Sequence, residues 1–221
     1  MMGKRWLPRA RPLWRIPLVL TLVCLVLLSA CTATEDELSE PTTQTPAGDF
    51  THPGTKITFP ESIRDFHRVE VTQYDKSGKD VSVGYNLDSP DLITATVYVY
   101  PGRDVLNLGS DSDTVSAAKN LLDQKQFEGA KKAILATTPG LTLVSETDSF
   151  VIANPGEQAG SRAIFEGQGL IDGALTVLDT EVDLFGFGDW FIKYRFTYPG
   201  ESSTAPALIL DFMNSLEWPA D

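Results

Sequence analysis

The sequence predicts an α+β domain: an antiparallel β-sheet with two main helices packed on it. Two observations lead to this class. Segments in which apolar and polar residues alternate, as they do in half-buried strands, occur both before and after a long helical segment. The elements follow one another in the order strand, strand, strand, helix, several strands, helix, and residues 50–221 have the length and apolar content of a single domain.

The first predicted hairpin joins a strand over residues 67–74 to a strand over residues 81–87. Gly78 supplies the left-handed conformation that a three-residue loop requires. A single register then satisfies both faces of the strand pair. Its cross-strand pairs are Val71 with Val83, Val69 with Tyr85, and Thr72 with Ser82.

A central strand and a long helix follow. Residues 93–100 (ITATVYVY) are mostly β-branched or aromatic on both faces, as expected of a strand that is covered on two sides. Polar caps at residues 111–113 begin a helix over residues 114–137, which Pro139 ends. Because Gly129 lies inside this segment, two shorter helices are an alternative. The buried stripe is expected to contain Val115, Ala118, Leu122, Ala130 and Ile134.

The last predicted hairpin joins residues 175–184 to residues 190–198. Pairing Leu184 with Trp190 places apolar residues on one face and charged residues on the other. The opposite residues are then Val182 with Ile192, Leu178 with Phe196, Glu181 with Lys193, and Asp179 with Arg195. Cross-strand ion pairs thus explain the four charges. Shorter strands are expected upstream, at residues 141–146, 150–153 and 161–166.

A final helix is predicted after Pro199, with Ser203 or Thr204 as its cap and Pro206 in its first turn. Trp218, which follows the helix, is expected to pack back on the sheet. The core stripe of this helix contains Leu208, Phe212 and Leu216.

Phe50 and the run Ile57-Thr58-Phe59-Pro60 precede the hairpins and helices, and the run Ser215-Leu216-Glu217-Trp218-Pro219 follows them. This arrangement resembles the PsbP-like fold, a family named for an extrinsic subunit of photosystem II that includes exported bacterial proteins and lipoproteins. The resemblance implies an assembly, binding or accessory role. It carries over no functional residue.

The N-terminal residues predict an export signal. Five cations precede the apolar run Ile16 to Leu28, which has 13 residues, whereas a transmembrane helix needs about 20. The run Leu28-Ser29-Ala30-Cys31 resembles the lipobox of bacterial lipoproteins, which implies that residues 1–30 are a removed signal peptide and that Cys31 is acylated. We therefore expect a protein of the bacterial cell envelope that acylated Cys31 anchors in the lipid bilayer. Thr32 favours the periplasmic face of the outer membrane in a Gram-negative cell.

Residues 31–49 are rich in Thr, Pro and acidic residues, and they predict a lipidated, disordered tether that leads to the domain over residues 50–221. All 30 acidic residues follow Cys31, but only 13 of the 18 basic residues do, so the mature chain has a net charge of −17. It has no basic stripe, which excludes a nucleic-acid partner. The signal contains Cys24 and Cys31 is acylated, so the mature domain has no disulfide.

The sequence contains no catalytic motif, phosphate-binding loop or zinc-site spacing. We therefore expect no enzyme activity, no catalytic residue, no metal and no cofactor, with structural or surface roles for His52 and His67. Phe185, Phe187 and Trp190 surround two glycines and are the candidate partner-binding residues, as an exposed aromatic tip. The alternative is that at least Phe185 and Trp190 pack into the core.

These observations predict a non-enzymatic envelope lipoprotein that acts by binding or as an assembly accessory, with a protein partner in the envelope. A small-molecule carrier is the first alternative, and it requires a pocket between sheet and helix lined by aromatic residues. A hydrolase is the second alternative, and it requires a deep cleft with a buried carboxylate or histidine.

Overall fold

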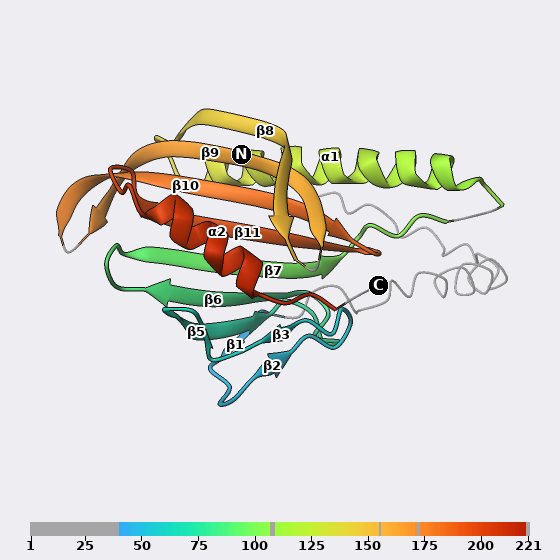
Figure 1. The fold of residues 1–221 in the computed structure, drawn as a ribbon, viewed down its shortest axis with the longest axis horizontal. Helices are drawn as coiled ribbons and strands as arrows, with labels where there is room; N and C mark the ends of the chain where they lie inside the picture. Colours follow the sequence, from blue (N-terminus) through green and yellow to red (C-terminus); the bar gives the residue numbers. More distant parts are fainter. Residues whose placement is uncertain (1–39, 107–108, 155, 172, 220–221) are drawn as a thin grey trace, which may run out of the picture. The chain divides into compact units, whose positions relative to one another are not determined.

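The computed structural model describes residues 40–106, 109–154, 156–171 and 173–219. Within these ranges the main feature is a nine-stranded antiparallel sheet (Figure 1), in which the strand order is β1-β5-β6-β7-β11-β10-β9-β8 and β4 pairs with β5. A separate two-stranded sheet pairs β2 (Phe50–Thr51) with β3 (Thr58–Phe59). The strands of the main sheet are β1 (Thr42–Gln44), β4 (Ser62–Ile63), β5 (Phe66–Gln73), β6 (Val81–Leu87), β7 (Ile93–Pro101), β8 (Thr142–Ala153), β9 (Glu157–Ile171), β10 (Ala174–Phe187) and β11 (Trp190–Pro199).

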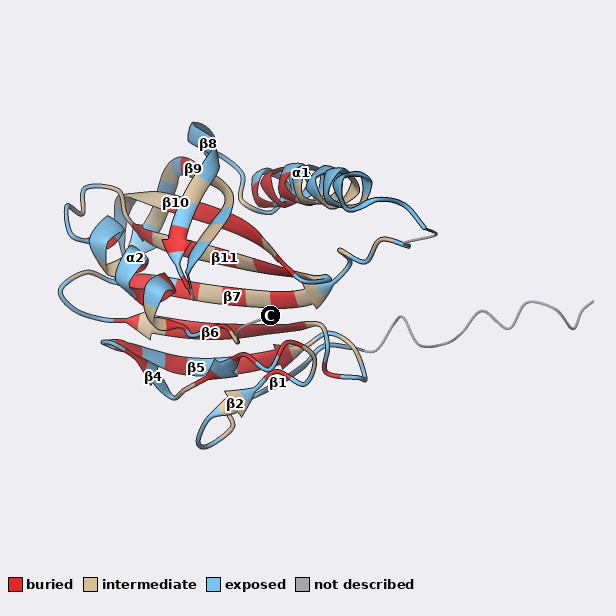
Figure 2. Ribbon diagram, turned by 45° about the vertical axis from the view of Figure 1, so that its right-hand side comes forward, coloured by how far each residue is buried: buried red, intermediate tan, exposed pale blue. Residues whose placement is uncertain are grey.

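The two helices cover opposite faces of the sheet. Helix α1 (Ser112–Thr137) packs on β9, β10 and β11, and α2 (Ala205–Ser215) packs on the other face (Figures 1 and 2). Strands β9 and β8 curve over the α2 face, where the backbone N–H of Ala153 donates to Asn214 Oδ1 at 2.9 Å. Neither helix extends over β6 and β5 on the face that carries α1. The predicted α+β class, an antiparallel sheet with two helices, is confirmed, and the PsbP-like resemblance stays a prediction.

Helix α1 is continuous. The Asp111 carboxylate accepts the Thr114 N–H at 2.7 Å and caps the helix, as predicted. Gly129 faces open space and does not break it, so the alternative of two shorter helices is wrong. The C-terminal half is buried through Phe127, which the predicted stripe missed, and through Ala130 and Ile134, which it contained. The other three predicted residues, which are only half-buried, are Val115, Ala118 and Leu122.

Helix α2 buries one face in the main core, and Pro206 lies in its first turn as predicted. Thr204 is the cap position, but its side chain caps nothing; Ser202 Oγ accepts the Ala205 N–H at 2.9 Å instead. Phe212 and Leu216 are buried as predicted. Trp218 packs back on the sheet as expected, and its indole N–H donates to the Tyr194 hydroxyl at 3.1 Å.

The first hairpin confirms the predicted register at Val71 with Val83 and at Thr72 with Ser82. Gly78 has the expected positive φ of 68°. The pairing of Val69 with Tyr85 is wrong, because the register shifts between residues 68 and 70. This irregularity leaves Val69 41% exposed and places Arg68 opposite Tyr85.

The last hairpin has a different register from the predicted one. Its strands run on to Phe187, which pairs with Trp190 across a two-residue turn, and Leu184 pairs with Lys193. The predicted register was therefore shifted by three residues. Because side chains alternate between faces, an odd shift exchanges the faces. Glu181 and Lys193 consequently project from opposite faces, and the predicted ion pairs of Glu181 with Lys193 and of Asp179 with Arg195 do not form.

Two boundary predictions also need correction. The segments 141–146 and 150–153 form the single strand β8, in which two register shifts interrupt the pairing with β9. Residues 40–49 of the predicted tether belong to the folded domain. Strand β1 pairs with β5, and the buried Arg68 donates to the carbonyls of Pro46 (2.8 Å) and Gly48 (2.5 Å). Cys31 and the signal peptide lie outside the described residues.

Candidate functional site

A cavity of about 180 Å³ lies between the C-terminal half of α1 and the strands β7, β11 and β10. It is located where α1 stops covering the sheet. Ala130 and Ile134 form an apolar wall on the helix, and the sheet side contributes an aromatic ring and two cations. We call this site the Lys193 pocket; it is lined by Tyr98, Ala130, Ala133, Ile134, Thr137, Val182, Lys193 and Arg195.

Strand alternation directs both cations into the pocket. Lys193 and Arg195 are two residues apart on β11, so they project from the same face of the sheet. Lys193 is paired with Tyr98 on β7 on one side and with Leu184 on β10 on the other. The residues between and beside the two cations point to the opposite, fully buried face; these are Ile192, Tyr194 and Phe196.

The ammonium group of Lys193 lies over aromatic rings rather than beside a carboxylate. Its Nζ is 3.9 Å from the centre of the Tyr98 ring and 5.7 Å from that of Tyr100. Burial lowers the pKa of Lys193, and the positive charge of Arg195 lowers it further, while Asp80 opposes them. Among the described residues, none of the ion pairs includes Lys193 or Arg195. The pocket therefore holds two cations whose charge no neighbouring carboxylate neutralises.

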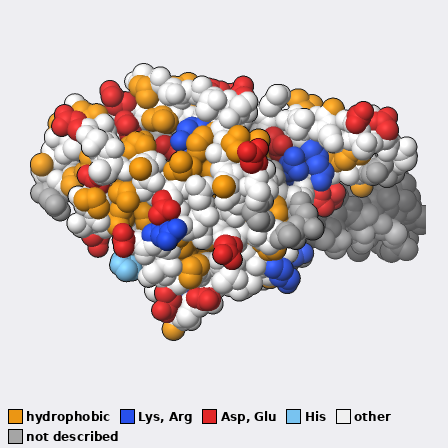
Figure 3. Space-filling model, viewed as in Figure 1, with side chains coloured by type: hydrophobic (Ala, Val, Ile, Leu, Met, Phe, Trp, Pro, Cys, Tyr) orange, Lys and Arg blue, Asp and Glu red, His pale blue; other side chains and the backbone are white. Residues whose placement is uncertain are grey.

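This local charge contrasts with the face of the molecule that Figure 3 shows. Acidic side chains are spread over the face shown in Figure 3, and the few Lys and Arg side chains lie there in separate small groups. A half-buried cation without a counter-ion costs free energy, and an anion that enters the site offsets that cost. Chemically, the pocket can bind a small anion that has an apolar part.

A larger cavity of about 300 Å³ lies on the other side of α1, against β8, β9 and β10. Its lining is polar and includes Asp123, but the charge of Asp123 is already matched. Arg103 binds this carboxylate with Nε at 2.6 Å and Nη2 at 3.0 Å. Of the two cavities, only the Lys193 pocket is lined by cations.

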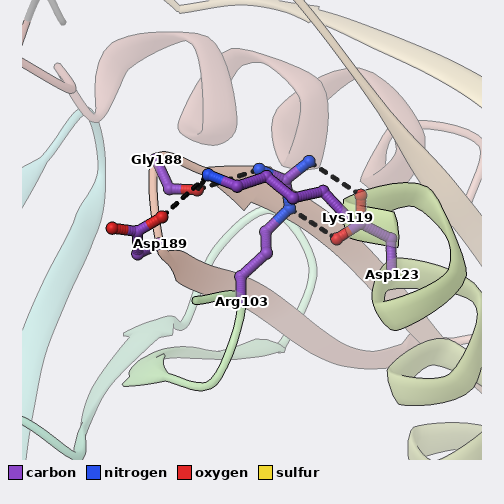
Figure 4. A network of polar contacts seen from close by, with 5 residues as sticks. All are labelled: Arg103, Lys119, Asp123, Gly188 and Asp189. Carbon is purple, nitrogen blue, oxygen red and sulfur yellow. Dashed lines mark hydrogen bonds and ion pairs between the residues drawn. The ribbon is translucent and has the colours of Figure 1, made fainter. Parts of the chain in front are cut away.

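The polar contacts of Arg103 belong to a cluster that fastens α1 to the turn between β10 and β11 (Figure 4). Arg103 Nη1 donates to the Gly188 carbonyl at 2.9 Å. Lys119 Nζ donates to the same carbonyl at 3.0 Å and to the Asp189 carboxylate at 2.7 Å. We call these four side chains and the Gly188 carbonyl the α1 clamp; its side chains belong to Arg103, Lys119, Asp123 and Asp189.

A buried acidic cluster lies on the opposite face of the sheet. Arg162 on β9 binds Asp183 with Nε at 2.6 Å and Glu181 with Nη2 at 2.6 Å. The Tyr198 hydroxyl donates to Glu181 Oε2 at 3.4 Å, and the ring of Phe150 covers the guanidinium carbon of Arg162 at 3.3 Å. Apart from the ion pair with Arg162, Glu181 Oε1 has no hydrogen-bond partner among the described residues.

One arginine cannot neutralise two buried carboxylates. Burial raises the pKa of Glu181 to about 9, and the nearby charge of Asp183 adds to this rise. Burial also raises the pKa of Asp183, against the opposing effect of Arg162. Glu181 is therefore protonated at neutral pH. Since Glu181 is 2% exposed and Asp183 is 0% exposed, neither carboxyl can touch a substrate in this conformation.

The predicted aromatic tip does not exist as an exposed feature. Phe185 is 1% exposed and Phe187 is 9% exposed, and both rings contact Trp218. Trp190 is half-buried and packs edge-on against His52. The alternative, in which at least Phe185 and Trp190 pack inward, describes the structure better. A partner site at these residues requires an exposed aromatic surface, and the structure has none there because the rings pack inward.

The histidines have the structural and surface roles expected of them. The ring of His52 is fully buried, and its Nδ1 accepts the Thr55 N–H at 2.9 Å. Its Nε2 lies 3.1 Å from the Lys79 carbonyl, and burial lowers its pKa. His67 is exposed beside Ser62. Within the described ranges, no group of three or more His, Cys, Asp and Glu residues could hold a metal ion, and no helix is long and apolar enough to cross a membrane.

The sequence analysis missed the Lys193 pocket because it explained Lys193 and Arg195 by ion pairs with Glu181 and Asp179. One signal was present. Two cations two residues apart on a strand must share a face, so the spacing places Lys193 and Arg195 on the same side of the sheet, but it does not reveal the cavity beside them.

Comparisons with known proteins give little. No family model matches the chain, and no curated protein matches it. Among solved structures, LpqN of Mycobacterium tuberculosis, described as involved in cell envelope biogenesis, is similar at 16% sequence identity over 84% of this chain and 84% of LpqN, with a TM-score of 0.27. A similarity this low supports no conclusion about fold or function.

Proposed function

We propose that this chain is an exported, lipid-anchored protein of the bacterial cell envelope, and that it acts by carrying a small molecule in the Lys193 pocket without changing it chemically. The export signal and the lipobox residues Leu28-Ser29-Ala30-Cys31 support the location. A carrier is expected to need a pocket between sheet and helix lined by aromatic residues; the Lys193 pocket lies between sheet and helix and has one aromatic residue, Tyr98, in its lining.

A single observation carries the binding role: a cavity lined by two cations that form no ion pair with any carboxylate of the described residues. Several buried or half-buried cations in this domain contact carboxylates, whereas the buried Arg68 donates to backbone carbonyls. Arg162, Arg103 and Lys131, for example, each contact carboxylates at 2.6 or 2.7 Å. Lys193 and Arg195 lie instead against a cavity, which favours a ligand as the missing partner.

The anchoring part of the proposal is tested with labelled palmitate. The wild-type protein and a Cys24→Ser variant should both incorporate the label, because Cys24 lies inside the removed signal. A Cys31→Ser variant should incorporate none and should leave the membrane fraction or accumulate unprocessed. Label in the Cys31→Ser variant would contradict acylation at Cys31.

The carrier part is tested by native mass spectrometry of the full-length protein, gently extracted from its own envelope. We expect a bound small molecule in the wild-type protein. Ala133→Trp should remove it, because Ala133 lines the pocket from the exposed side of α1 and can take a larger side chain without strain in the core. Ala136→Trp, on the same helix but outside the lining, is the matched control. Equal occupancy in both variants, or no bound molecule in the wild-type protein, would refute the carrier role.

A further inference from the structure

The chemical class of the ligand can be read from the Lys193 pocket, on the assumption that the proposed carrier function is correct. The charge gives the first part of the answer. Lys193 and Arg195 are about 7 Å apart along β11, since they are separated by two residues of a strand. Two cationic groups on long side chains at this spacing can converge on one oxyanion, and the planar guanidinium of an arginine binds carboxylate and phosphate oxygens in a bidentate manner.

Other charged groups around the site leave this sign unchanged. Asp80 is the acidic residue whose charge acts on Lys193, and it forms no ion pair with it. Glu70, on β5 of the same sheet, acts on Tyr98. On the helix side, the pocket is lined by Ala130, Ala133, Ile134 and Thr137, none of which is charged. A cationic ligand would therefore meet two like charges at close range, and a neutral ligand would leave both cations unpaired.

The size of the pocket gives the second part of the answer. A cavity of about 150 Å³ with apolar walls is known to hold one benzene molecule. At about 180 Å³, the Lys193 pocket has room for one aromatic ring or a short acyl chain together with a small anionic group. Ala130, Ile134 and Val182 provide apolar contacts for this part of the ligand. Larger polyanions are excluded by the volume.

We propose that the Lys193 pocket binds a small organic oxyanion, a carboxylate or phosphate monoester of about one ring or a short chain, with its anionic group between Lys193 and Arg195 and its apolar part against α1. Tyr98 holds the Lys193 side chain in position through its ring. Binding neutralises the half-buried cations and displaces water from the apolar wall, so charge and hydrophobic burial act together.

The test uses full-length acylated protein in detergent micelles and isothermal titration calorimetry. The probes are benzoate, phenyl phosphate and benzamide, of which benzamide is the neutral isostere of benzoate. We expect saturable binding of at least one of the two anions and at least about tenfold weaker binding of benzamide, because a charge-assisted contact is lost. The comparison of benzoate with phenyl phosphate separates the two oxyanion classes.

Two variants locate the anionic group. Lys193→Met keeps the aliphatic stem on Tyr98 and removes the charge, and Arg195→Met does the same for the second cation. Each should weaken binding of the preferred anion about tenfold or more. Lys125→Met, which removes an exposed cation of α1 outside the pocket lining, is the control and should bind normally. If either variant does not fold, the benzoate and benzamide comparison on the wild-type protein still decides the question.

A pH readout separates direct binding from a general structural effect. Since burial lowers the pKa of free Lys193, an anion beside it should shift that pKa back upward and cause proton uptake at a pH where Lys193 titrates, so the titrations are run over a pH series that spans this range. The measured heat should therefore depend on the ionisation enthalpy of the buffer in the wild-type protein and less so in Lys193→Met.

The outcomes distinguish the two proposals. Benzamide that binds as tightly as benzoate, or anion binding that survives both Met substitutions, would overturn the oxyanion assignment. If Ala133→Trp still displaces the natural ligand in that case, the carrier function stands. If Ala133→Trp displaces nothing, the carrier function fails as well.

Discussion

The guanidinium of Arg162 lies 2.6 Å from the carboxyl of Glu181, and both side chains project from the face of the sheet that carries α2. The two residues belong to adjacent strands, β9 and β10, and the same guanidinium also binds Asp183. Phe150 on β8 covers the arginine from the third strand. The cluster thus ties together three strands at the edge of the sheet, where backbone pairing with β8 is interrupted by register shifts.

Glu181→Gln should be about as stable as the wild type near pH 4.5 and more stable than it at pH 7, because the glutamine resembles the protonated acid but takes up no proton on folding. The folded pKa of Glu181 is raised to about 9 from an ordinary value of 4.5. The stabilising effect of its proton is therefore fully present below the unfolded pKa and is lost as pH rises through the folded pKa. The unfolding free energy of the wild type should fall between about pH 5 and pH 9.

Urea unfolding at pH 5, 7 and 8.5 measures this pH dependence. Glu181→Gln should show a shallower decline than the wild type, and Asp183 accounts for part of the decline that remains, since its pKa is raised as well. Identical slopes for the two proteins would mean that Glu181 is already ionised in the folded state.

Arg162→Met should be much more costly, because it leaves two buried carboxyls without their cation. Loss of one partner of a buried ion pair costs about 3–5 kcal/mol. The loss should grow as pH rises, since Glu181 then ionises in a site without positive charge. Arg64→Met is the control: its ion pair with Asp211 has side chains 61% and 53% exposed, and such pairs contribute about 0–1 kcal/mol. Similar losses for the two variants would contradict a stabilising role of the cluster.

The two hairpins show how far sequence patterns reach. The register of the first hairpin was predictable, because the position of the loop glycine and the residue pattern on both faces are compatible with the same register. The bulge at Val69 was not, since Val69 and Val71 alternate with polar residues as in a regular strand, although the bulge leaves Val69 exposed and Val71 buried. In the last hairpin, the sequence pattern favoured a register that places the charged residues on an exposed face, where they can form ion pairs across the strands. The observed register buries Glu181 and Asp183, which is tolerable only because Arg162 lies on a third strand whose position the pattern did not fix.

The Lys193 pocket illustrates a similar limit. The face on which Lys193 lies follows from the alternation of β11, once the buried residues Ile192, Tyr194 and Phe196 are recognised. The cavity itself depends on where α1 crosses the sheet, and this is set by the packing of Phe127 and Ile134 against β9–β11. Helix placement on a sheet has no local sequence signal, so the site could not be predicted without the structure.

Phe187→Ala should destabilise the domain rather than disrupt a surface contact. The ring is 9% exposed and lies 5.6 Å from the centre of the Trp218 ring, so truncation leaves a cavity that costs about 3–5 kcal/mol. Leu121→Ala, on an α1 residue that is 66% exposed, should change stability by no more than about 0.5 kcal/mol. Chemical unfolding followed by tryptophan fluorescence compares the two. A Phe187→Ala protein as stable as Leu121→Ala would restore the exposed aromatic tip as a hypothesis.

Arg103→Gln should loosen the N-terminal half of α1 while leaving the C-terminal half in place. The first half of the helix buries little surface and is held by the α1 clamp, in which Arg103 packs so closely on Gly186 that a Cβ there would lie 2.2 Å from its Nε. The second half is fixed by Phe127 and Ile134 in the core. Hydrogen exchange should therefore quicken about tenfold in residues 112–122, which corresponds to about 1.4 kcal/mol of local stability, and change little in residues 127–137. Lys125→Gln, which removes an exposed cation of the same helix, serves as the control and should leave both rates as they are. Uniform acceleration along the whole helix would show that α1 opens as a single unit, and that the clamp also holds the wall of the Lys193 pocket.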